Sequence, residues 1–305
     1  MKIKTSAEYF NFLKKFGWDR ASFDKAFPQR SFDNCINNHS VETRKLKYKG
    51  RKGLVDAWLV HPKQQANTKK TPLVIYNRGG AAKWGKLIMA DLLNFCQLAE
   101  QGYAVIASDF RGSKPKGVSN NESIPLDVTD LGYGDVYDSI DLITLASEIG
   151  TIDTSKVALW GFSRGTMINA MMLTKIKNIK AVIMSGTVSR KDDDFRRSEF
   201  DEHVYPLIVD NWNALTKAEQ QKLLLGVSPL HLIDGILSKP AFLFLHGAKD
   251  KRTPANRMLN YVQALQDKGH TIELRLYSEG THNLYKYQGT VLEEISNWLE
   301  TNLKP

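Results

Sequence analysis

The feature that most restricts the fold of this chain is a short segment in which two glycines flank a serine. Gly161 and Gly165 lie on either side of Ser163, after the apolar run 157–159 and before a segment that opens as a helix at Thr166. The apolar run predicts a buried strand, and the glycines predict a turn too tight for a Cβ on either side. Such a strand–turn–helix unit holds the serine in a strained conformation with its hydroxyl exposed at the end of a sheet. A serine in this position is typical of a nucleophile.

The motif alone occurs often by chance, so its interpretation depends on two residues further along the chain. The apolar segment 240–246 predicts a second buried strand, and the loop after it carries Asp250. A third strand is expected over 272–277, followed by a loop with His282. Serine, aspartate and histidine in this order are typical of the α/β-hydrolase fold, and each follows the C-terminal end of a predicted parallel strand. The sequence therefore predicts that the three residues form a catalytic triad.

The chemistry expected of this triad is acyl transfer. Ser163 would attack a carbonyl carbon while His282 removes the hydroxyl proton, and Asp250 would hold the imidazole in the required tautomer. His282 would then protonate the leaving group, and water would release the acyl-enzyme. This reaction needs no cofactor and no metal, and we expect neither. The two cysteines, Cys35 and Cys96, have no metal-ligand spacing around them.

An oxyanion intermediate also needs hydrogen-bond donors. One is expected to be the backbone N–H of Arg164, which follows the nucleophile at the start of a helix. The second should come from the loop after the strand predicted at 73–76, where two glycines stand. Gly80 is the first choice and Gly79 the second, because a glycine lets the backbone approach the oxyanion closely. The substrate-binding residues remain unknown from the sequence.

Alternation of strands and helices after residue 70 predicts an α/β protein with the α/β-hydrolase fold. We expect a mostly parallel eight-stranded sheet with helices on both faces, opened by a hairpin over 41–61. The irregular segment at about 186–238, after strand 6, predicts a cap insertion over the site. The domain prediction is an N-terminal helical extension over 1–40 and a hydrolase domain with this cap over 41–305. Aromatic residues at helical spacing within 5–30 predict two short helices that end at Pro28.

The formal net charge of +9 could indicate a nucleic-acid partner. However, the basic run 44–52 alternates like the outer face of an edge hairpin, where lysines keep a strand edge soluble. We therefore expect no nucleic-acid partner. No apolar stretch is long enough for a membrane span and the first residues do not resemble a secretion signal, so no membrane association is expected. A cytoplasmic location with Cys35 and Cys96 as reduced thiols is the prediction.

Several polar residues offer alternative roles. His246 is expected to be a packed, hydrogen-bonded histidine at the end of a strand. His203 and His231 belong to the cap region and its exit, where either could contact substrate. Asp135 precedes the nucleophile in the chain, which is the wrong order for the triad acid, so a surface or structural carboxylate is expected. Ser185 lacks a glycine-flanked turn and is not expected to be a second nucleophile.

From about residue 41 onward, the chain resembles the catalytic domain of the prolyl oligopeptidase family within the α/β-hydrolase superfamily. The resemblance is carried by motifs that occur in the family's order over most of the chain. They are IYNRGG (75–80), DFRGS (109–113), GDVYD (134–138), IDTSKVALWGFSRG (152–165), SPL (228–230), LHGAKD (245–250) and GTH (280–282). The resemblance implies the same fold and triad. The family's β-propeller is not expected, because only about 40 residues precede the first hairpin.

Two residues depart from the family's pattern. Arg78 stands before the loop glycines where the family commonly has histidine, and Arg164 follows the nucleophile where tyrosine is frequent. The first hypothesis is therefore a serine hydrolase that cleaves small carboxylic esters. The alternative is an aminopeptidase or acyl-peptide hydrolase of prolyl oligopeptidase type, and the second alternative is a binding protein that has lost turnover. The expected partner is a small ester or a short peptide, and a hairpin edge or the N-terminal helices could pair subunits in an oligomer.

Overall fold

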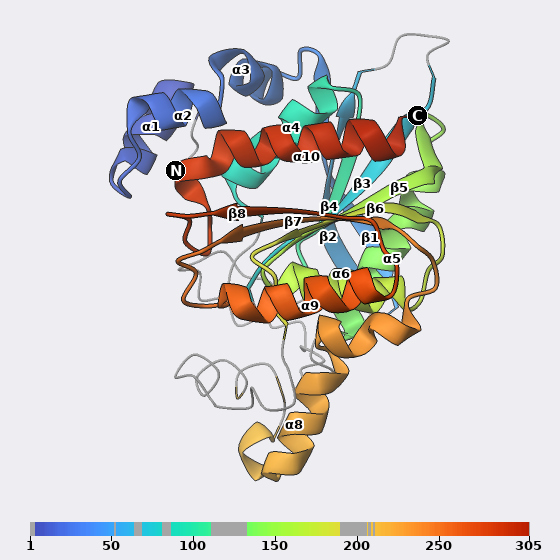
Figure 1. Ribbon diagram of the computed structural model, residues 1–305. Helices are drawn as coiled ribbons and strands as arrows, with labels where there is room; N and C mark the ends of the chain where they lie inside the picture. The colour runs from blue at the N-terminus through green and yellow to red at the C-terminus, as the bar shows by residue number, and fades with distance from the viewer. Residues whose placement is uncertain are drawn as a thin grey trace.

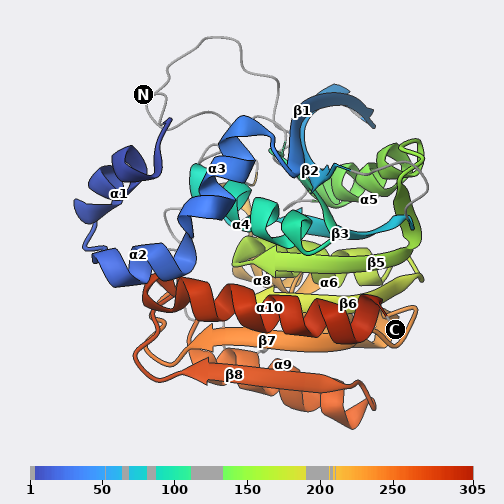
Figure 2. The same cartoon turned by 90° about the horizontal axis from the view of Figure 1, so that it is seen from above.

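A computed structural model describes residues 4–51, 53–63, 69–80, 87–110, 133–189 and 211–304, together with Pro206 and Val209. Its centre is a twisted eight-stranded sheet in the order β1-β2-β4-β3-β5-β6-β7-β8, which Figure 2 shows from above. The strands are Val41–Gly50 (β1), Gly53–Pro62 (β2), Thr71–Asn77 (β3), Ala104–Ser108 (β4), Ile152–Phe162 (β5), Ile179–Ser185 (β6), Ala241–Gly247 (β7) and Ile272–Tyr277 (β8).

The pairing of the strands confirms the predicted sheet. β1 and β2 form an antiparallel hairpin, β2 pairs with β4 antiparallel, and all other neighbours are parallel. Every residue of β3 is buried, as expected for a parallel strand covered on both faces. Leu73 and Ile75 point into one core, whereas Val74 and Tyr76 point into the other. The apolar runs that marked the strands are therefore divided between two hydrophobic layers.

Helices cover both faces of this sheet (Figure 1). α5, α6 and α9 contribute to the core on one face, and α4, α10 and the N-terminal helices contribute to the core on the other. The helices are Ser6–Lys14 (α1), Arg20–Ala26 (α2), Gln29–Asn37 (α3), Met89–Glu100 (α4), Tyr133–Ser147 (α5), Arg164–Leu173 (α6), Lys217–Gly226 (α8), Ala255–Asp267 (α9) and Gln288–Leu303 (α10), with 3₁₀ turns at Trp212–Ala214 (η3), Pro229–Gly235 (η4) and Tyr285–Tyr287 (η5).

The N-terminal segment contains three helices where the sequence predicted two. Pro28 does not end the helical segment but stands as the N-cap of α3, with φ −54° and ψ 139°. Proline is tolerated at the start of a helix because its missing N–H has no partner in the first turn. The three helices pack beside α4 and α10, and they bury Phe23, Phe27 and Phe32 almost completely. Packing on one face of the sheet is thus their structural role.

The expectation of reduced cysteines is wrong. Cys35 in α3 and Cys96 in α4 form a disulfide, with Cα atoms 5.6 Å apart and a sequence separation of 61. No local sequence pattern indicates this pairing, because only the packing of α3 against α4 brings the two residues together. The disulfide ties the N-terminal helices to the helical layer of the sheet.

The segment expected to form a cap is described only in part. Residues 190–205 lie outside the described residues, whereas η3, α8 and η4 are described, and α8 extends away from the body in Figure 1. The cap and the domain boundaries therefore remain predictions. Within the described ranges, no helix is long and apolar enough to cross a bilayer.

Candidate active site

Ser163 occupies a sharp turn between β5 and α6. Its backbone has φ 51° and ψ −119°, a combination that is strained for any residue with a side chain. The flanking glycines are required by contact: a Cβ on Gly161 would lie 2.6 Å from the carbonyl oxygen of Gly165, and a Cβ on Gly165 would lie 1.8 Å from that of Asn77. The predicted tight turn is confirmed. It places the serine at the C-terminal end of the sheet, beside the ends of its neighbouring strands.

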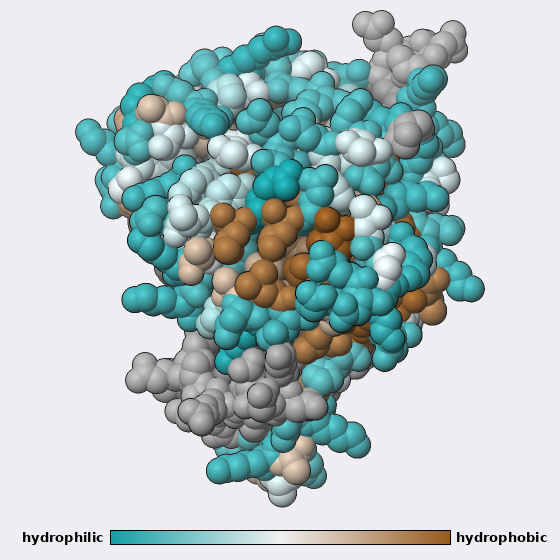
Figure 3. Space-filling model, in the orientation of Figure 1, coloured by the Kyte–Doolittle hydropathy of each residue, from teal (hydrophilic) through white to brown (hydrophobic). Residues whose placement is uncertain are grey.

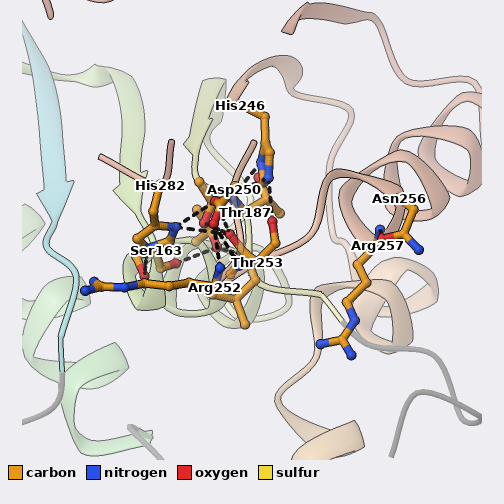
Figure 4. A network of polar contacts seen from close by, with 12 residues as sticks. Ser163, Thr187, His246, Asp250, Arg252, Thr253, Asn256, Arg257 and His282 are labelled. Atoms are coloured by element: carbon orange, nitrogen blue, oxygen red, sulfur yellow. Dashed lines mark hydrogen bonds and ion pairs between the residues drawn. The ribbon is translucent and has the colours of Figure 1, made fainter. Parts of the chain in front are cut away.

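The three residues predicted to act together form a hydrogen-bonded line with His282 in the middle. Ser163 Oγ is 2.8 Å from His282 Nε2, and His282 Nδ1 is 2.7 Å from Asp250 Oδ2 (Figure 4). Asp250 follows β7, and His282 follows β8, so two adjacent parallel strands deliver the acid and the base. Both side chains are almost fully buried, which limits competition from water for these hydrogen bonds.

Thr253 is a member of this network that sequence reasoning missed. Its hydroxyl donates to Asp250 Oδ2 at 2.6 Å and lies 3.2 Å from His282 Nδ1. The backbone N–H groups of Arg252 and Thr253 donate to Asp250 Oδ1, which forms an Asx turn. A hydroxyl three residues after a loop aspartate is a local signal for such a turn, and it could have indicated Thr253.

These hydrogen bonds decide the charge of Asp250. Burial by itself raises the pKa of this carboxyl, but hydrogen bonds from His282 and Thr253 outweigh burial and lower the pKa to about 2. The group is therefore a carboxylate at neutral pH. A carboxylate at this position orients the neutral imidazole and stabilises the imidazolium that forms when the base takes a proton.

His246 lies near the same carboxylate but is bonded differently. Its Nε2 donates to the carbonyl oxygen of Thr253 at 2.7 Å, and its Nδ1 accepts the backbone N–H of Thr187 at 3.3 Å. The ring has no exposed surface, and burial lowers its pKa. The prediction of a packed, hydrogen-bonded histidine is confirmed.

The loop after β3 approaches the nucleophile closely. A Cβ on Gly79 would lie 2.9 Å from the ring of Phe162 and 3.1 Å from the Cβ of Ser163, so only glycine fits without displacement. Gly80 has a positive φ of 82°, which also favours glycine. Arg164 is the first residue of α6. Gly79 and Arg164 thus lie beside Ser163, and the role of Arg164, Gly80 and Gly79 as oxyanion donors remains a prediction.

The side chain of Arg164 forms a buried ion pair next to the elbow. Its Nη2 lies 2.6 Å from Asp135 Oδ2 in the first turn of α5, and both side chains are largely buried. Asp135 is therefore a structural carboxylate, as expected. Arg78 stacks over the ring of Phe110 and donates to the carbonyl oxygen of Asp109. Burial, followed by the charge of Arg164, lowers the pKa of Arg78 to about 10.

The remaining candidates that the structure describes lie outside the hydrogen-bonded line of Ser163, His282 and Asp250. His231 is exposed in η4, and His203 lies outside the described residues. The carbonyl of Ser185 accepts the N–H of Ser163, which supports the turn. Among the residues that the structure describes, no cluster of three or more His, Cys, Asp or Glu side chains could hold a metal ion.

A nucleophile elbow at the end of a mostly parallel eight-stranded sheet, with helices on both faces, defines the class of this protein as a serine hydrolase of the α/β-hydrolase fold. The sequence profile of the prolyl oligopeptidase family matches residues 90–305, which is more than half of the chain. The chain belongs to this family.

Similar proteins agree with this assignment. The acylamino-acid-releasing enzyme of Mus musculus is 26% identical over 266 residues, which cover 81% of this chain and 34% of the mouse protein. Dipeptidyl-peptidase 4 of Giardia intestinalis is 23% identical over 252 residues, covering 82% of this chain and 33% of that protein. The solved acylaminoacyl peptidase of Pyrococcus horikoshii has a TM-score of 0.72 at 19% identity, covering 90% of this chain and 44% of that one. This likeness shows the fold, and the chain spans about a third of the length of these curated relatives.

Proposed function

We propose that this chain is a serine peptidase that cleaves short peptides, with a free or acylated amino end, through an acyl-enzyme on Ser163. The observation that carries the proposal is the continuous hydrogen-bonded line from Ser163 through His282 to Asp250 on a strained elbow. A binding protein that had lost turnover would not need this geometry.

In this mechanism, His282 Nε2 accepts the Ser163 proton while Oγ forms a bond to the carbonyl carbon. The electron pair of the carbonyl moves onto its oxygen. The intermediate collapses when the imidazolium gives the proton to the leaving nitrogen, and the C–N bond breaks. A water molecule then repeats both steps on the acyl-enzyme. Asp250 stays ionised throughout, because its hydrogen bonds hold its pKa at about 2.

The oxyanion is assigned to the backbone N–H of Arg164 and to an N–H of the glycine loop after β3. The close approach of Gly79 to Ser163 Cβ supports this loop as the second donor, and Gly80 follows it at a positive φ. The ion pair between Arg164 and Asp135 supports the first donor, because it fixes the residue whose N–H must point at the oxyanion. Removal of one such donor typically costs about 3 kcal/mol in the transition state.

The sequence favoured small esters, whereas the comparisons favour the peptidase alternative. The curated relatives named above are a releasing enzyme for acylated amino acids and a dipeptidyl-peptidase. Amide cleavage demands a proton for the departing nitrogen, and His282 is held where it can supply one. Ester cleavage stays the second candidate, because any enzyme able to form this acyl-enzyme from an amide will also form it from an activated ester.

The test compares matched substrates that share one amino acid, alanine. We would measure kcat/KM for alanine p-nitroanilide, N-acetyl-alanine p-nitroanilide and N-acetyl-alanine p-nitrophenyl ester. Anilide turnover above that of Ser163→Ala is the expected result, and the ratio of the first two substrates tells whether a free or an acylated amino end is preferred. Ester turnover without any anilide turnover would overturn the peptidase proposal in favour of an esterase.

A covalent probe separates an enzyme from a binding protein. A fluorophosphonate should label wild-type protein stoichiometrically at Ser163, and Ser163→Ala should remain unlabelled. The matched control is Ser185→Ala, which removes a nearby serine hydroxyl outside the elbow and should label like wild type. Absence of labelling in folded wild-type protein would contradict the enzyme proposal.

The disulfide bears on the predicted cytoplasmic location. Disulfides persist mainly in oxidising compartments, and the pairing of Cys35 with Cys96 therefore counts against a reducing one. Titration of free thiols in protein purified under alkylating conditions would test this directly. Two free thiols would favour the cytoplasm, and none would favour an oxidising compartment.

A further inference from the structure

The two outer strands of the sheet differ in how they are protected from pairing with another chain. β1 carries Lys45, Lys47 and Lys49, and charged lysines are a common device against edge-to-edge association. β8 carries no lysine and no proline. In the part of the chain that the structure describes, β8 pairs with β7 on one side only, so the backbone of its outer side is available.

An apolar band follows this free edge. Figure 3 shows hydrophobic side chains gathered along β8 and the adjoining α9, between two hydrophilic regions. Leu276 of β8 is 47% exposed and Leu259 of α9 is 42% exposed, and Ile272 and Leu274 are only partly buried. An exposed strand edge with apolar side chains is a site at which another strand can pair.

The alternate positions of β8 carry opposite charges. Glu273 and Arg275 point to the α10 side, where Arg275 Nη2 lies 2.6 Å from Glu273 and its Nε lies 3.0 Å from Glu294 of α10. The side chains of Glu273 and Arg275 are 46% and 39% exposed, so both could also reach across to a neighbouring strand. The order along β8 is thus apolar, acidic, apolar, basic, apolar over residues 272–276.

We propose that β8 pairs with β8 of a second copy of this chain, antiparallel and centred on Leu274. This register sets Leu274 opposite Leu274, Ile272 opposite Leu276, and Glu273 opposite Arg275, twice in each dimer. Every apolar residue then faces an apolar residue, and every charge faces its opposite. The strand is therefore complementary to itself, which is the condition for a closed two-fold interface.

The pairing joins two eight-stranded sheets into one, and α9 of each copy approaches α9 of the other. The exposed side chain of Leu259 on α9 would then be covered by the second copy. Contact between the two β8 strands alone would leave it exposed. β1 contains a similar Glu42–Arg44 ion pair, but lysines occupy alternate positions over the rest of the strand. In a pairing of two β1 strands centred on Lys47, Lys47 would face Lys47 and Lys45 would face Lys49, and like charges oppose pairing.

Sedimentation equilibrium of the 305-residue chain tests the proposal over a wide range of concentration. We expect a reversible dimer for wild type, and a chain that stays monomeric at every concentration would overturn the proposal. E273R sets arginine opposite arginine, and R275E sets glutamate opposite glutamate. Each should weaken the dimer by about tenfold or more, because the change occurs twice in a symmetric interface. The double swap E273R/R275E restores opposite charges and should recover most of the loss.

The opposite edge supplies the matched control. E42R and R44E disturb the corresponding ion pair on β1 and should leave the dimer constant unchanged. Circular dichroism and thermal unfolding of every variant exclude loss of fold as the cause of dissociation. If the β1 variants dissociate the dimer as strongly as the β8 variants do, the proposed surface is wrong.

The register is tested by cross-linking. In the proposed pairing the Cβ atoms of the two Leu274 residues lie about 5 Å apart. L274C should therefore form a disulfide-linked dimer under mild oxidation. L276C, which faces Ile272 of the second copy, should not cross-link to itself. Cross-linking of L276C in preference to L274C would overturn this register.

Discussion

Two histidines at neighbouring strand ends approach one carboxylate, yet their surroundings give them different roles. His282, in the loop after β8, lies 2.7 Å from Asp250 Oδ2, and His246, at the end of β7, lies 3.5 Å from the same atom. Figure 4 shows both rings beside Asp250. Proximity to the acid therefore does not distinguish a proposed base from a structural residue.

The second nitrogen of each ring makes the distinction. His282 Nε2 faces the hydroxyl of Ser163, whereas both nitrogens of His246 are bonded to backbone groups of Thr253 and Thr187. A histidine whose two nitrogens are occupied by backbone has no site left for a proton from substrate. It can hold two loops together instead, and the variants below separate these roles.

His282→Ala is expected to show the largest effect. It removes the proposed base, so kcat should fall by about a millionfold while the free energy of unfolding changes little. Ser163→Ala should have the same residual kcat, and the kcat of the double variant should be no lower than that of either single variant. Steady-state kinetics on the N-acetyl-alanine ester would measure this. Additive losses in the double variant would mean that the two residues do not act as one unit.

Asp250→Asn comes next, with an expected loss in kcat of about ten-thousandfold. The amide cannot hold His282 with its proton on Nδ1 as a carboxylate does, so the imidazole presents the wrong tautomer to Ser163. The KM should change far less than kcat. A loss below tenfold in a folded variant would remove Asp250 from the triad.

Thr253→Val should lower kcat by about tenfold, because it deletes one hydrogen bond to a charged group. Thr253→Ser keeps the hydroxyl and serves as the control, which should retain most of the activity. An unchanged kcat in the valine variant would show that the hydroxyl does not support the orientation of Asp250.

His246→Leu should mainly lower stability. The change leaves the carbonyl of Thr253 and the N–H of Thr187 without partners in a buried site, at a cost of about 2–4 kcal/mol in the free energy of unfolding. The kcat of the folded fraction should fall by less than tenfold. Chemical denaturation and kinetics at low temperature measure the two effects separately, and a triad-sized loss of kcat would contradict the structural role.

The smallest expected effect is a pH dependence of stability. Burial lowers the pKa of His246 below its ordinary value of 6.5, so the unfolded chain binds a proton before the folded protein does. The contribution of His246 is complete above pH 6.5 and declines as the pH falls below it. Unfolding at a series of pH values should show this slope in wild type and a reduced slope in His246→Leu. Equal slopes in both proteins would assign the dependence to other groups.

Much of this site was readable from the sequence because its signals are local. The elbow at Ser163 is set by two glycines within five residues, and Asp250 and His282 each follow a strand that its apolar run reveals. Parallel strands deliver their C-terminal ends to one edge of the sheet. Chain order and strand pattern were therefore sufficient to predict which three residues meet there.

Contacts between distant segments could not be read in this way. No residue near Cys35 or Cys96 indicates that the two cysteines pair. The ion pair between Arg164 and Asp135 likewise joins two helices, α6 and α5, that are separated in the sequence. The sequence does not distinguish the two roles of Pro28, because a proline can follow the end of one helix or stand at the start of the next, as it does in α3.

The sequence by itself determined the α/β-hydrolase sheet and the identity of the three triad candidates, because hydrophobic periodicity and turn chemistry act over a few residues. The tertiary structure decided how Thr253 supports Asp250, that the cysteines are paired, and which edge of the sheet is left apolar. Each of these depends on how helices and strands pack in space, and packing joins residues that the chain keeps far apart.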